Sequence, residues 1–330
     1  MSSQFNSVYR LHLQTVHTCA TVVHMTRLEN YDERLTRRAT APGAEEWLGV
    51  PIEVLDQGFL YLVDYMGNDE AIEQAARVSY GAGTRQVQET RGLIRYLLRH
   101  QHTTPFEMIE VKFHAKMPIF VARQWIRHRT ANVNEMSARY SVLPDEFYVP
   151  EDEVIQLQST DNKQGRGEQA DEETRRDVRR FLKMDAHQAY EHYTEMIEAG
   201  AARELARANL PVSIYTEWYW KIDLHNLMHF LKLRLDSHAQ YEIRVFGEAM
   251  AKIVGESFPL AWEAFEDYVL YSERFSRQEL EVLRGFLEVN RNSSGVPEAQ
   301  ILEGVINAVG VTNSRELAEL NDKFKMLGVL

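Results

Sequence analysis

The sequence predicts a mixed α/β or α+β fold, because stretches with the period of a β-strand alternate with stretches that have the period of an α-helix. Between residues 109 and 117, apolar side chains alternate with polar or charged ones, and the same period of two returns between residues 213 and 222. Several other segments after residue 54 repeat apolar residues at helical spacing. We therefore expect a mixed core over roughly residues 50 to 270.

The first 50 residues carry little regular pattern, so residues 1–50 are predicted to form a partly irregular N-terminal extension. Residues 1–24 lack the apolar stretch and the small-residue cleavage site of a secretory signal. Met25 opens a charged segment that could itself be a native start. An over-long gene model is therefore an alternative explanation for residues 1–24.

Two helices are predicted before the first strand. Asn68 and Asp69 are capping residues ahead of an apolar stripe that begins at Ile72, and a second stripe covers residues 93–98. After the strand, Pro118 suits the first position of a helix. This third helix is predicted to continue to about Arg127.

A polar, glycine-containing stretch at residues 156–170 is predicted to be a solvated loop. The long charged helix that follows has an apolar side over residues 178–197, and Gly200 is placed to end it. After the second strand, helices are predicted to begin at Asp223 and at Asp236, because each is an acceptable N-cap.

Three short helices are predicted after residue 271, which gives a helical C-terminal extension over residues 271–330. Ser276 with Glu279, and Asn313 with Glu316, have the spacing of a capping box ahead of apolar stripes. No catalytic residue types cluster there, so this segment is interpreted as an appended module.

The composition excludes several classes of protein. The chain has 330 residues, and no apolar run approaches the roughly 18 residues that cross a bilayer. Its single cysteine, Cys19, permits no intrachain disulfide or thiol-ligated metal site, and a reducing, cytoplasmic setting fits best. The net charge of −12 argues against a general nucleic-acid or anionic-membrane binder. Any anionic ligand must therefore find a local basic pocket.

Residues 123–140 are the segment richest in chemistry. Four arginines and a histidine fall within it: Arg123, Arg127, Arg129, Arg139 and His128. On a continuous helix, Gln124, Arg127 and His128 would share one face. Guanidinium groups bind phosphates at two points, so the segment predicts a pocket for a phosphorylated ligand. On charge alone, a solvated surface near a helix C-terminus is an equal alternative.

Four sequence blocks occur in a fixed order. The central block has Arg-His-Arg at residues 127–129, then seven residues, then Ser137, then Arg139-Tyr140. The others are His-Gln-His-Thr-Thr-Pro-Phe-Glu at residues 100–107, Arg-Glu-Leu-Ala-Arg at residues 203–207 and Leu-Arg-Leu-Asp-Ser-His-Ala-Gln at residues 233–240. In this order they resemble the motifs of the flavin-dependent thymidylate synthases, over roughly residues 54 to 265.

The resemblance implies a methyltransferase that converts dUMP to dTMP. Methylenetetrahydrofolate would give the carbon, and NADPH would give the reducing equivalents through bound FAD. It also implies a mostly antiparallel, non-Rossmann sheet packed with helices over residues 51–270, interrupted by the polar loop at 156–170. The expected assembly is a homotetramer with active sites between subunits, without nucleic-acid or membrane partners.

The resemblance also implies roles for individual residues. For the cofactor it indicates Ser79, Thr104, Glu107, Arg127, His128, Arg129, Glu135, Asp223, His225 and His229. For the nucleotide it indicates Gln124, Arg127, Glu135, Ser137, Ala138, Arg139, Arg207 and Arg234. As catalytic residues it indicates Arg234, Ser137 and His102, and it implies no metal.

Arg234 is expected to lie against the uracil edge, where a guanidinium favours the ionised ring and raises electron density at carbon 5. A surface cation between two leucines is the alternative. Ser137 has no general base beside it in sequence, so a hydrogen-bonding role is preferred over a nucleophilic one. His102 is expected to help position flavin or folate, and a structural histidine is the alternative.

The chain departs from the family pattern at four positions. Asp223, His225 and His229 stand where the family often has asparagine, arginine and asparagine, and a carboxylate at position 223 would repel the phosphates of FAD. Weaker flavin binding is one expected consequence. Ala138 replaces a common glycine, which is tolerable if that backbone needs no positive φ.

Parts of the sequence are also compatible with two other functions. His225 and His229 stand at i and i+4 with His238 following, which is compatible with a metal-dependent hydrolase, although the glutamate of a zinc-protease motif is missing. A nucleic-acid-binding module would use the arginines of residues 123–139, against the net charge of the chain. Cys19 lies outside every matched block, so it is a poor candidate for the thiolate that ordinary thymidylate synthases use.

Overall fold

The computed structural model describes residues 38–78, 89–160, 165–292 and 295–329. The chain divides into two units, Met1–Arg38 and Ala39–Leu330, and only Arg38 of the first lies within the described residues. Ser79 and Cys19 fall outside them.

An antiparallel sheet of five strands forms the centre of the second unit, in the order β1-β2-β3-β7-β4. The strands are β1 (Ile52–Val54), β2 (Gly58–Met66), β3 (Glu110–Pro118), β7 (Tyr215–Asp223) and β4 (Asn132–Glu135). The two alternating runs of the sequence are β3 and β7, which lie side by side with Phe113 opposite Trp220. All four pairings are antiparallel. The predicted mixed fold with a mostly antiparallel sheet is confirmed.

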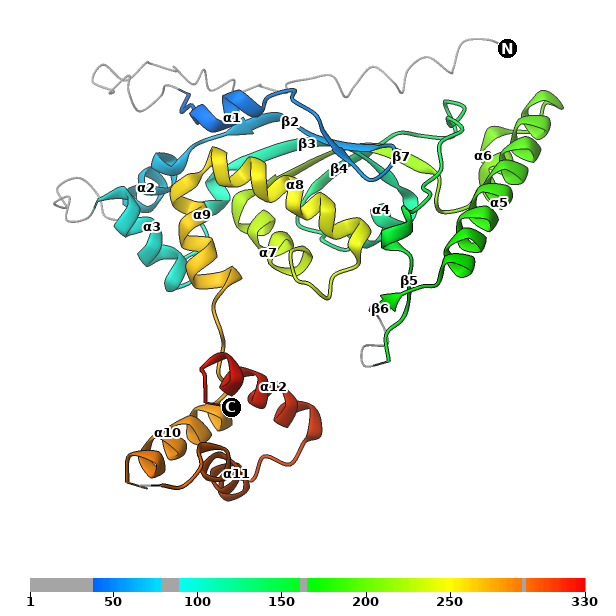
Figure 1. Ribbon diagram of the computed structural model, residues 1–330. Helices are drawn as coiled ribbons and strands as arrows, with labels where there is room; N and C mark the ends of the chain where they lie inside the picture. The colour runs from blue at the N-terminus through cyan, green and yellow to red at the C-terminus, as the bar shows by residue number, and fades with distance from the viewer. Residues whose placement is uncertain (1–37, 79–88, 161–164, 293–294, 330) are drawn as a thin grey trace, which may run out of the picture. The chain divides into compact units, whose positions relative to one another are not determined.

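The inward side chains of the strands pack against helices on one face of the sheet. Trp125 of α4 (Ile119–Trp125) meets Trp218 and Trp220 of β7 edge-on, with ring centroids 5.3 and 5.1 Å apart. The other helices of this layer are α7 (Leu224–Arg234), α8 (Tyr241–Ser257) and α9 (Pro259–Phe265) (Figure 1). Helix α1 (Pro42–Trp47) contacts α8, so the buried core begins at Ala41, earlier than residue 51.

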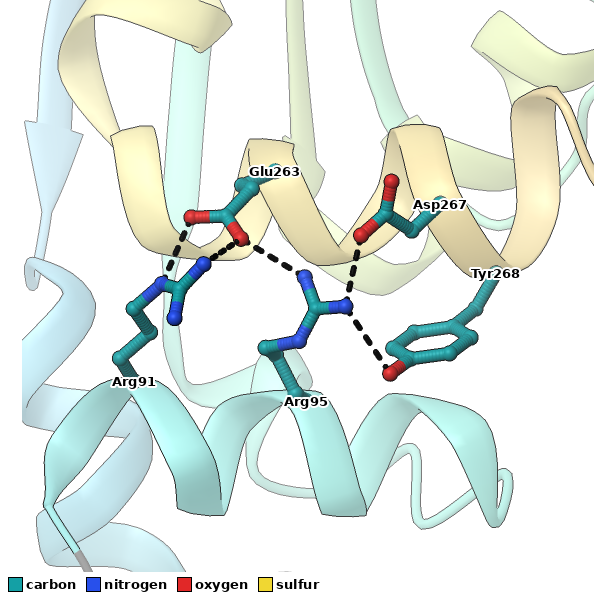
Figure 2. A network of polar contacts seen from close by, with 5 residues as sticks. All are labelled: Arg91, Arg95, Glu263, Asp267 and Tyr268. Atoms are coloured by element: carbon teal, nitrogen blue, oxygen red, sulfur yellow. Dashed lines mark hydrogen bonds and ion pairs between the residues drawn. The ribbon is translucent and has the colours of Figure 1, made fainter.

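Helix α3 (Thr90–Arg99) is joined to α9 and to the π-helical turn Glu266–Leu270 by an ion-pair network, which Figure 2 shows. Arg95 contacts Glu263 at 2.7 Å, Asp267 at 2.6 Å and the Tyr268 hydroxyl at 3.0 Å. Arg91 donates from its Nε to Glu263 at 2.9 Å. The network fixes the helix that leads directly into residues 100–107. The other predicted helix of this region is α2 (Asp69–Arg77), and Asn68 caps it as expected.

Three predicted segments differ in the structure. The helix after Pro118 ends at Trp125, before Arg127. The helix expected from Asp236 begins at Tyr241, because the Asp236 carboxylate instead accepts from the His238 amide at 2.8 Å inside a turn. The stretch at residues 156–170 was expected to be a loop, but it contains the paired strands β5 (Gln156–Gln158) and β6 (Arg166–Gln169).

Helix α5 (Glu172–Glu198) is the predicted long helix, and Gly200 follows it with a φ of +84°. Tyr193 is buried near its C-terminal end, where its hydroxyl accepts from the Leu143 amide at 3.1 Å. Toward its N-terminal half, the expected apolar side is exposed at Phe181. Helix α6 (Arg203–Ala206) and the turn Arg207–Asn209 follow.

The C-terminal residues form α10 (Arg277–Asn292), α11 (Glu298–Val309) and α12 (Ser314–Met326), as predicted. These helices have a buried cluster of their own, which includes Phe286, Ile301, Leu302, Leu320 and Phe324. Both predicted caps are present at Ser276 and Asn313. In the part of the chain that the structure describes, every helix is too short or too polar to span a bilayer.

Candidate active site

A cavity of about 480 Å³ lies beside the end of β4, at one edge of the sheet. Its walls come from β4, the turn after it, α4 and the segment from α6 to β7. Five of the eight residues predicted to hold the nucleotide line it: Glu135, Ser137, Ala138, Arg139 and Arg207. The fold thus brings two distant sequence blocks to one cavity.

The turn after β4 sets the direction of these side chains. Strand pairing continues past β4, because the Met136 amide donates to the Glu217 carbonyl oxygen at 2.9 Å. The Ser137 hydroxyl then accepts from the Arg139 amide at 3.3 Å, which leaves its O–H free to donate to a ligand. Ala138 is buried in this turn and has no positive φ, so alanine replaces the family's glycine without backbone strain.

Arginines outnumber carboxylates in the cavity wall. The charged groups are Arg123, Arg139, Arg207, Glu135 and Glu204. Arg139 and Glu204 lie 3.7 Å apart and are both largely exposed, so solvent screens this ion pair. Glu135 accepts from the buried Thr216 hydroxyl at 2.7 Å, which fixes its carboxylate. A positive cavity with fixed hydrogen-bonding groups suits a phosphorylated ligand that also carries hydroxyls.

Arg234 and His128 form a second group of predicted site residues, at the C-terminal end of α7. Nη2 of Arg234 lies 3.0 Å from Nε2 of His128. Burial, together with the positive charges of Arg234 and His229, lowers the pKa of His128 to about 4. His128 is therefore neutral at pH 7 and accepts the hydrogen bond from Arg234, which places its own proton on Nδ1.

Arg234 retains an unused donor. Its Nε is buried without a hydrogen-bond partner among the described residues, and burial also lowers the pKa of its guanidinium. Gly247 of α8 makes room for the side chain, since a Cβ added there would lie 3.2 Å from the Arg234 Cβ. A buried donor without a partner is costly. Six other buried side-chain nitrogens of the described residues also lack a partner, so this nitrogen alone does not indicate a ligand.

Most of the residues predicted to hold FAD lie near α7 or in the chain after α4. Thr104 and Glu107 lie just before or within the turn Phe106–Met108, which contacts α7. Arg127 and Arg129 are exposed, and neither makes an ion pair with any other described residue. The two available guanidinium groups fit an anionic dinucleotide such as FAD.

Asp223 is the N-cap of α7, as predicted. Its carboxylate accepts from the Asn226 amide at 2.9 Å and from Asn226 Nδ2 at 2.7 Å. The helix N-terminus stabilises this negative charge, which offsets part of the repulsion expected toward the phosphates of FAD. His225 is half-buried and His229 is exposed on the same helix, and their contact with FAD stays a prediction.

His102 lies past the end of α3 and is exposed. Its ring stacks on Tyr96, with ring centroids 6.0 Å apart. This contact involves neither Arg234 nor Ser137, the other two predicted catalytic residues. A role of His102 beside the flavin stays a prediction.

The expectation that Gln124, Arg127 and His128 share one helix face is wrong. Helix α4 ends at Trp125, and the His128 amide donates to the Trp125 carbonyl oxygen at 3.0 Å in the following turn. The three side chains therefore diverge: Gln124 bonds Gln240, His128 bonds Arg234, and Arg127 is exposed.

Several site residues were missed in the sequence. Arg123 was expected in a basic pocket but was not among the individual nucleotide-binding residues, and it lines the cavity. Thr216 faces the cavity only because β4 pairs with β7, a pairing that no local pattern indicates. Gln240 bonds Gln124 of α4, a contact between distant segments that no local pattern indicates.

The histidines considered for a metal site do not gather into one. His238 pairs with Asp236 at 2.9 Å. Within the described ranges, no three side chains of the metal-binding types form a group that could hold an ion.

A non-Rossmann antiparallel sheet with an arginine-lined cavity and a part-buried arginine–histidine pair fits a class of protein that binds an anionic, phosphorylated ligand. The family model described as thymidylate synthase complementing protein matches residues 61–260. The chain belongs to this family, which confirms the one predicted from the four sequence blocks.

Similar proteins carry a more specific name. A flavin-dependent thymidylate synthase of Ruegeria pomeroyi is 56% identical over 268 residues, which cover 79% of this chain and 89% of the relative. One from Wolbachia pipientis wMel is 57% identical over 247 residues, with 74% and 87% covered. The methyltransferase class and the flavin and folate requirement follow from these similarities.

A solved structure has the same fold. It is a UMP/dUMP methylase, PolB from Streptomyces cacaoi, bound with 5-Br UMP. Its TM-score is 0.60 at 35% identity, with 67% of this chain and 99% of that chain covered. A second structure of that methylase, bound with 5-Br dUMP, also has a TM-score of 0.60. Neither the relatives nor these structures support the metal-dependent hydrolase or the nucleic-acid module.

Proposed function

We propose that this chain methylates dUMP to dTMP, with methylenetetrahydrofolate as carbon donor and NADPH as reductant through FAD. The observation that carries the proposal is the arginine-lined cavity together with the part-buried Arg234–His128 pair. In a chain with a net charge of −12, a cavity in which arginines outnumber carboxylates is a local concentration of positive charge that suits an anionic ligand.

In the proposed site, Arg139 and Arg207 bind the phosphate of dUMP, since both line the cavity and guanidinium groups bind phosphates at two points. Glu135, held by Thr216, accepts a hydrogen bond from a sugar hydroxyl. The free O–H of Ser137 donates to the nucleotide, which is a binding role rather than a nucleophilic one. Ala138 contributes its backbone.

Arg234 is proposed to lie against the uracil edge. The neutral His128 accepts from Nη2, so the guanidinium cannot rotate freely. A positive group at a uracil carbonyl stabilises the negative charge that develops there and makes carbon 5 more nucleophilic. Bound FAD supplies the hydride that reduces the transferred carbon.

FAD is proposed to contact Arg127, Arg129 and His128. The other residues proposed to hold it are Ser79, Thr104, Glu107, Glu135, Asp223, His225 and His229, and His102 would help to position the flavin or the folate. The protein's part in this chemistry is to bind and orient the flavin and the nucleotide next to one another.

The active unit is proposed to be a homotetramer with sites between subunits. Phe181 and Met184 of α5 are more than half exposed, and so is Leu205 of α6. Exposed apolar side chains of this size are stabilised by cover from another copy. Light scattering should give the mass of four chains, and a monomer would contradict this.

Residues 51–270 are proposed as the catalytic domain and residues 271–330 as a separate helical extension, since the latter has its own buried cluster. The N-terminal extension, expected over residues 1–50, is proposed to end before Ala41, because Ala41 and helix α1 pack into the core of the catalytic domain. A cytoplasmic location is proposed because the single cysteine suits a reducing compartment.

The purified protein tests the reaction directly. It should show a flavin spectrum that NADPH bleaches, and it should form dTMP only when dUMP, methylenetetrahydrofolate and NADPH are all present. Protein that stays colourless after incubation with FAD, or that forms no dTMP when reconstituted, would overturn the proposal.

A further inference from the structure

Glu242 of α8 is a buried carboxylate that the reaction described above does not use. It is 2% exposed, and a carboxylate so deeply buried must be hydrogen-bonded. Oε1 accepts from the Tyr148 hydroxyl at 3.1 Å and from Arg166 Nη2 at 2.5 Å. Oε2 accepts from Gln240 Nε2 at 2.9 Å. Both oxygens therefore have donors from other parts of the fold.

These contacts lead through two amides to Gln124 of α4, which follows Arg123 of the cavity wall. Gln240 accepts at its Oε1 from Nε2 of Gln124, which is one of the residues predicted to bind the nucleotide. A carboxylate can only accept, so the NH₂ group of Gln240 must face Glu242 and its carbonyl must face Gln124. The NH₂ group of Gln124 must then face Gln240, which leaves the carbonyl oxygen of Gln124 for a ligand.

We propose that Glu242 is a positioning residue for nucleotide binding: its charge orients Gln240, which orients Gln124 so that the Gln124 carbonyl oxygen accepts from dUMP. The proposal rests on the proposed function. Arg166, which anchors Glu242, comes from strand β6 of the hairpin at residues 156–170. Through Arg166, the hairpin therefore helps to hold the nucleotide site in place, although it lies between the matched sequence blocks.

An isosteric substitution tests the orienting role. Arg166 can only donate, so in Glu242→Gln the oxygen of the new amide stays with Arg166 and its NH₂ group faces Gln240. Both amides then reverse, and Gln124 presents its NH₂ group to dUMP instead of its carbonyl oxygen. The KM for dUMP should rise about tenfold, the effect of losing one hydrogen bond of about 1.4 kcal/mol, while kcat and the flavin content stay near wild type. Glu248→Gln, which removes an exposed carboxylate from the same helix, is the matched control and should leave both constants unchanged.

A double-mutant cycle separates positioning from a general structural effect. In a Gln124→Ala background, Glu242→Gln should add nothing to the KM for dUMP, because the group that it orients is gone. Gln240→Ala breaks the same connection while Glu242 keeps Tyr148 and Arg166, so it should raise KM similarly and serves where Glu242→Gln fails to fold.

Unchanged KM in Glu242→Gln, or full additivity with Gln124→Ala, would overturn the proposal and leave the proposed function standing. If Glu242→Gln does not fold, an unchanged KM in Gln240→Ala would overturn it in the same way. Wild-type protein that turns over no dUMP would overturn both.

Discussion

Thr216→Val tests whether the buried wall of the cavity orients the nucleotide. The side chain is 3% exposed, and its hydroxyl donates to Glu135 Oε1 at 2.7 Å. Valine keeps the shape and removes only this donor, so the Glu135 carboxylate becomes free to rotate. Hydrogen bonds to charged groups contribute about 1.5–3 kcal/mol, but water can replace the donor at the exposed Glu135.

We therefore expect a loss of about 1 kcal/mol in dUMP binding, which is about fivefold in Kd. Titration calorimetry with dUMP measures this directly, and the melting temperature should stay close to wild type. Thr194→Val is the matched control, because its hydroxyl donates to the Tyr190 carbonyl oxygen within α5, away from the cavity lining. Unchanged dUMP affinity in Thr216→Val would refute the reasoning, as would an equal loss in Thr194→Val.

Three further predictions concern Arg234, its neighbours and the C-terminal helices. Burial lowers the pKa of His128 from 6.5 to about 4, so the unfolded chain takes up a proton at a higher pH than the folded chain does. The free energy of unfolding should therefore fall as the pH drops from 6.5 to 4, with a slope below about 1.4 kcal/mol per pH unit because His128 is half-exposed. Urea titrations of His128→Asn should lack this pH-dependent fall. Gly247→Ala should lower kcat while the flavin spectrum remains, because the new Cβ would press on Arg234. Gly304→Ala, in which the new Cβ would meet open space, is the control and should leave kcat unchanged. Equal kcat values in the two variants would contradict this. Phe286→Ala should destabilise the C-terminal helices by about 3–5 kcal/mol, seen as faster proteolysis there, without loss of dTMP synthesis; parallel loss of activity would argue against a separate extension.

The strands could be predicted because their signals are local. In β3 and β7, a period of two continues over a whole strand, and aromatic residues favour the pleated surface. The ends of helices depended on competing contacts instead. Asp236 is a good capping residue by type, but its carboxylate is used in a turn, and α8 begins only at Tyr241. No glycine or proline after Trp125 marks the end of α4.

The same distinction applies to the candidate site. Sequence blocks indicated Glu135, Ser137 and Arg139 because these residues stand in one continuous motif. Thr216 could not be found in this way, since its place depends on the pairing of β4 with β7. Arg166 lies in a stretch without alternation, and its contact with the buried Glu242 supports a hairpin that local patterns do not predict.

The central claim is that Arg234, held by His128, activates the uracil ring next to the bound flavin. Arg234→Ala tests it most directly, with dTMP formation and the flavin absorption spectrum measured on the same preparation. We expect dTMP formation to be abolished while the flavin remains bound. Near-normal turnover by Arg234→Ala would contradict the account.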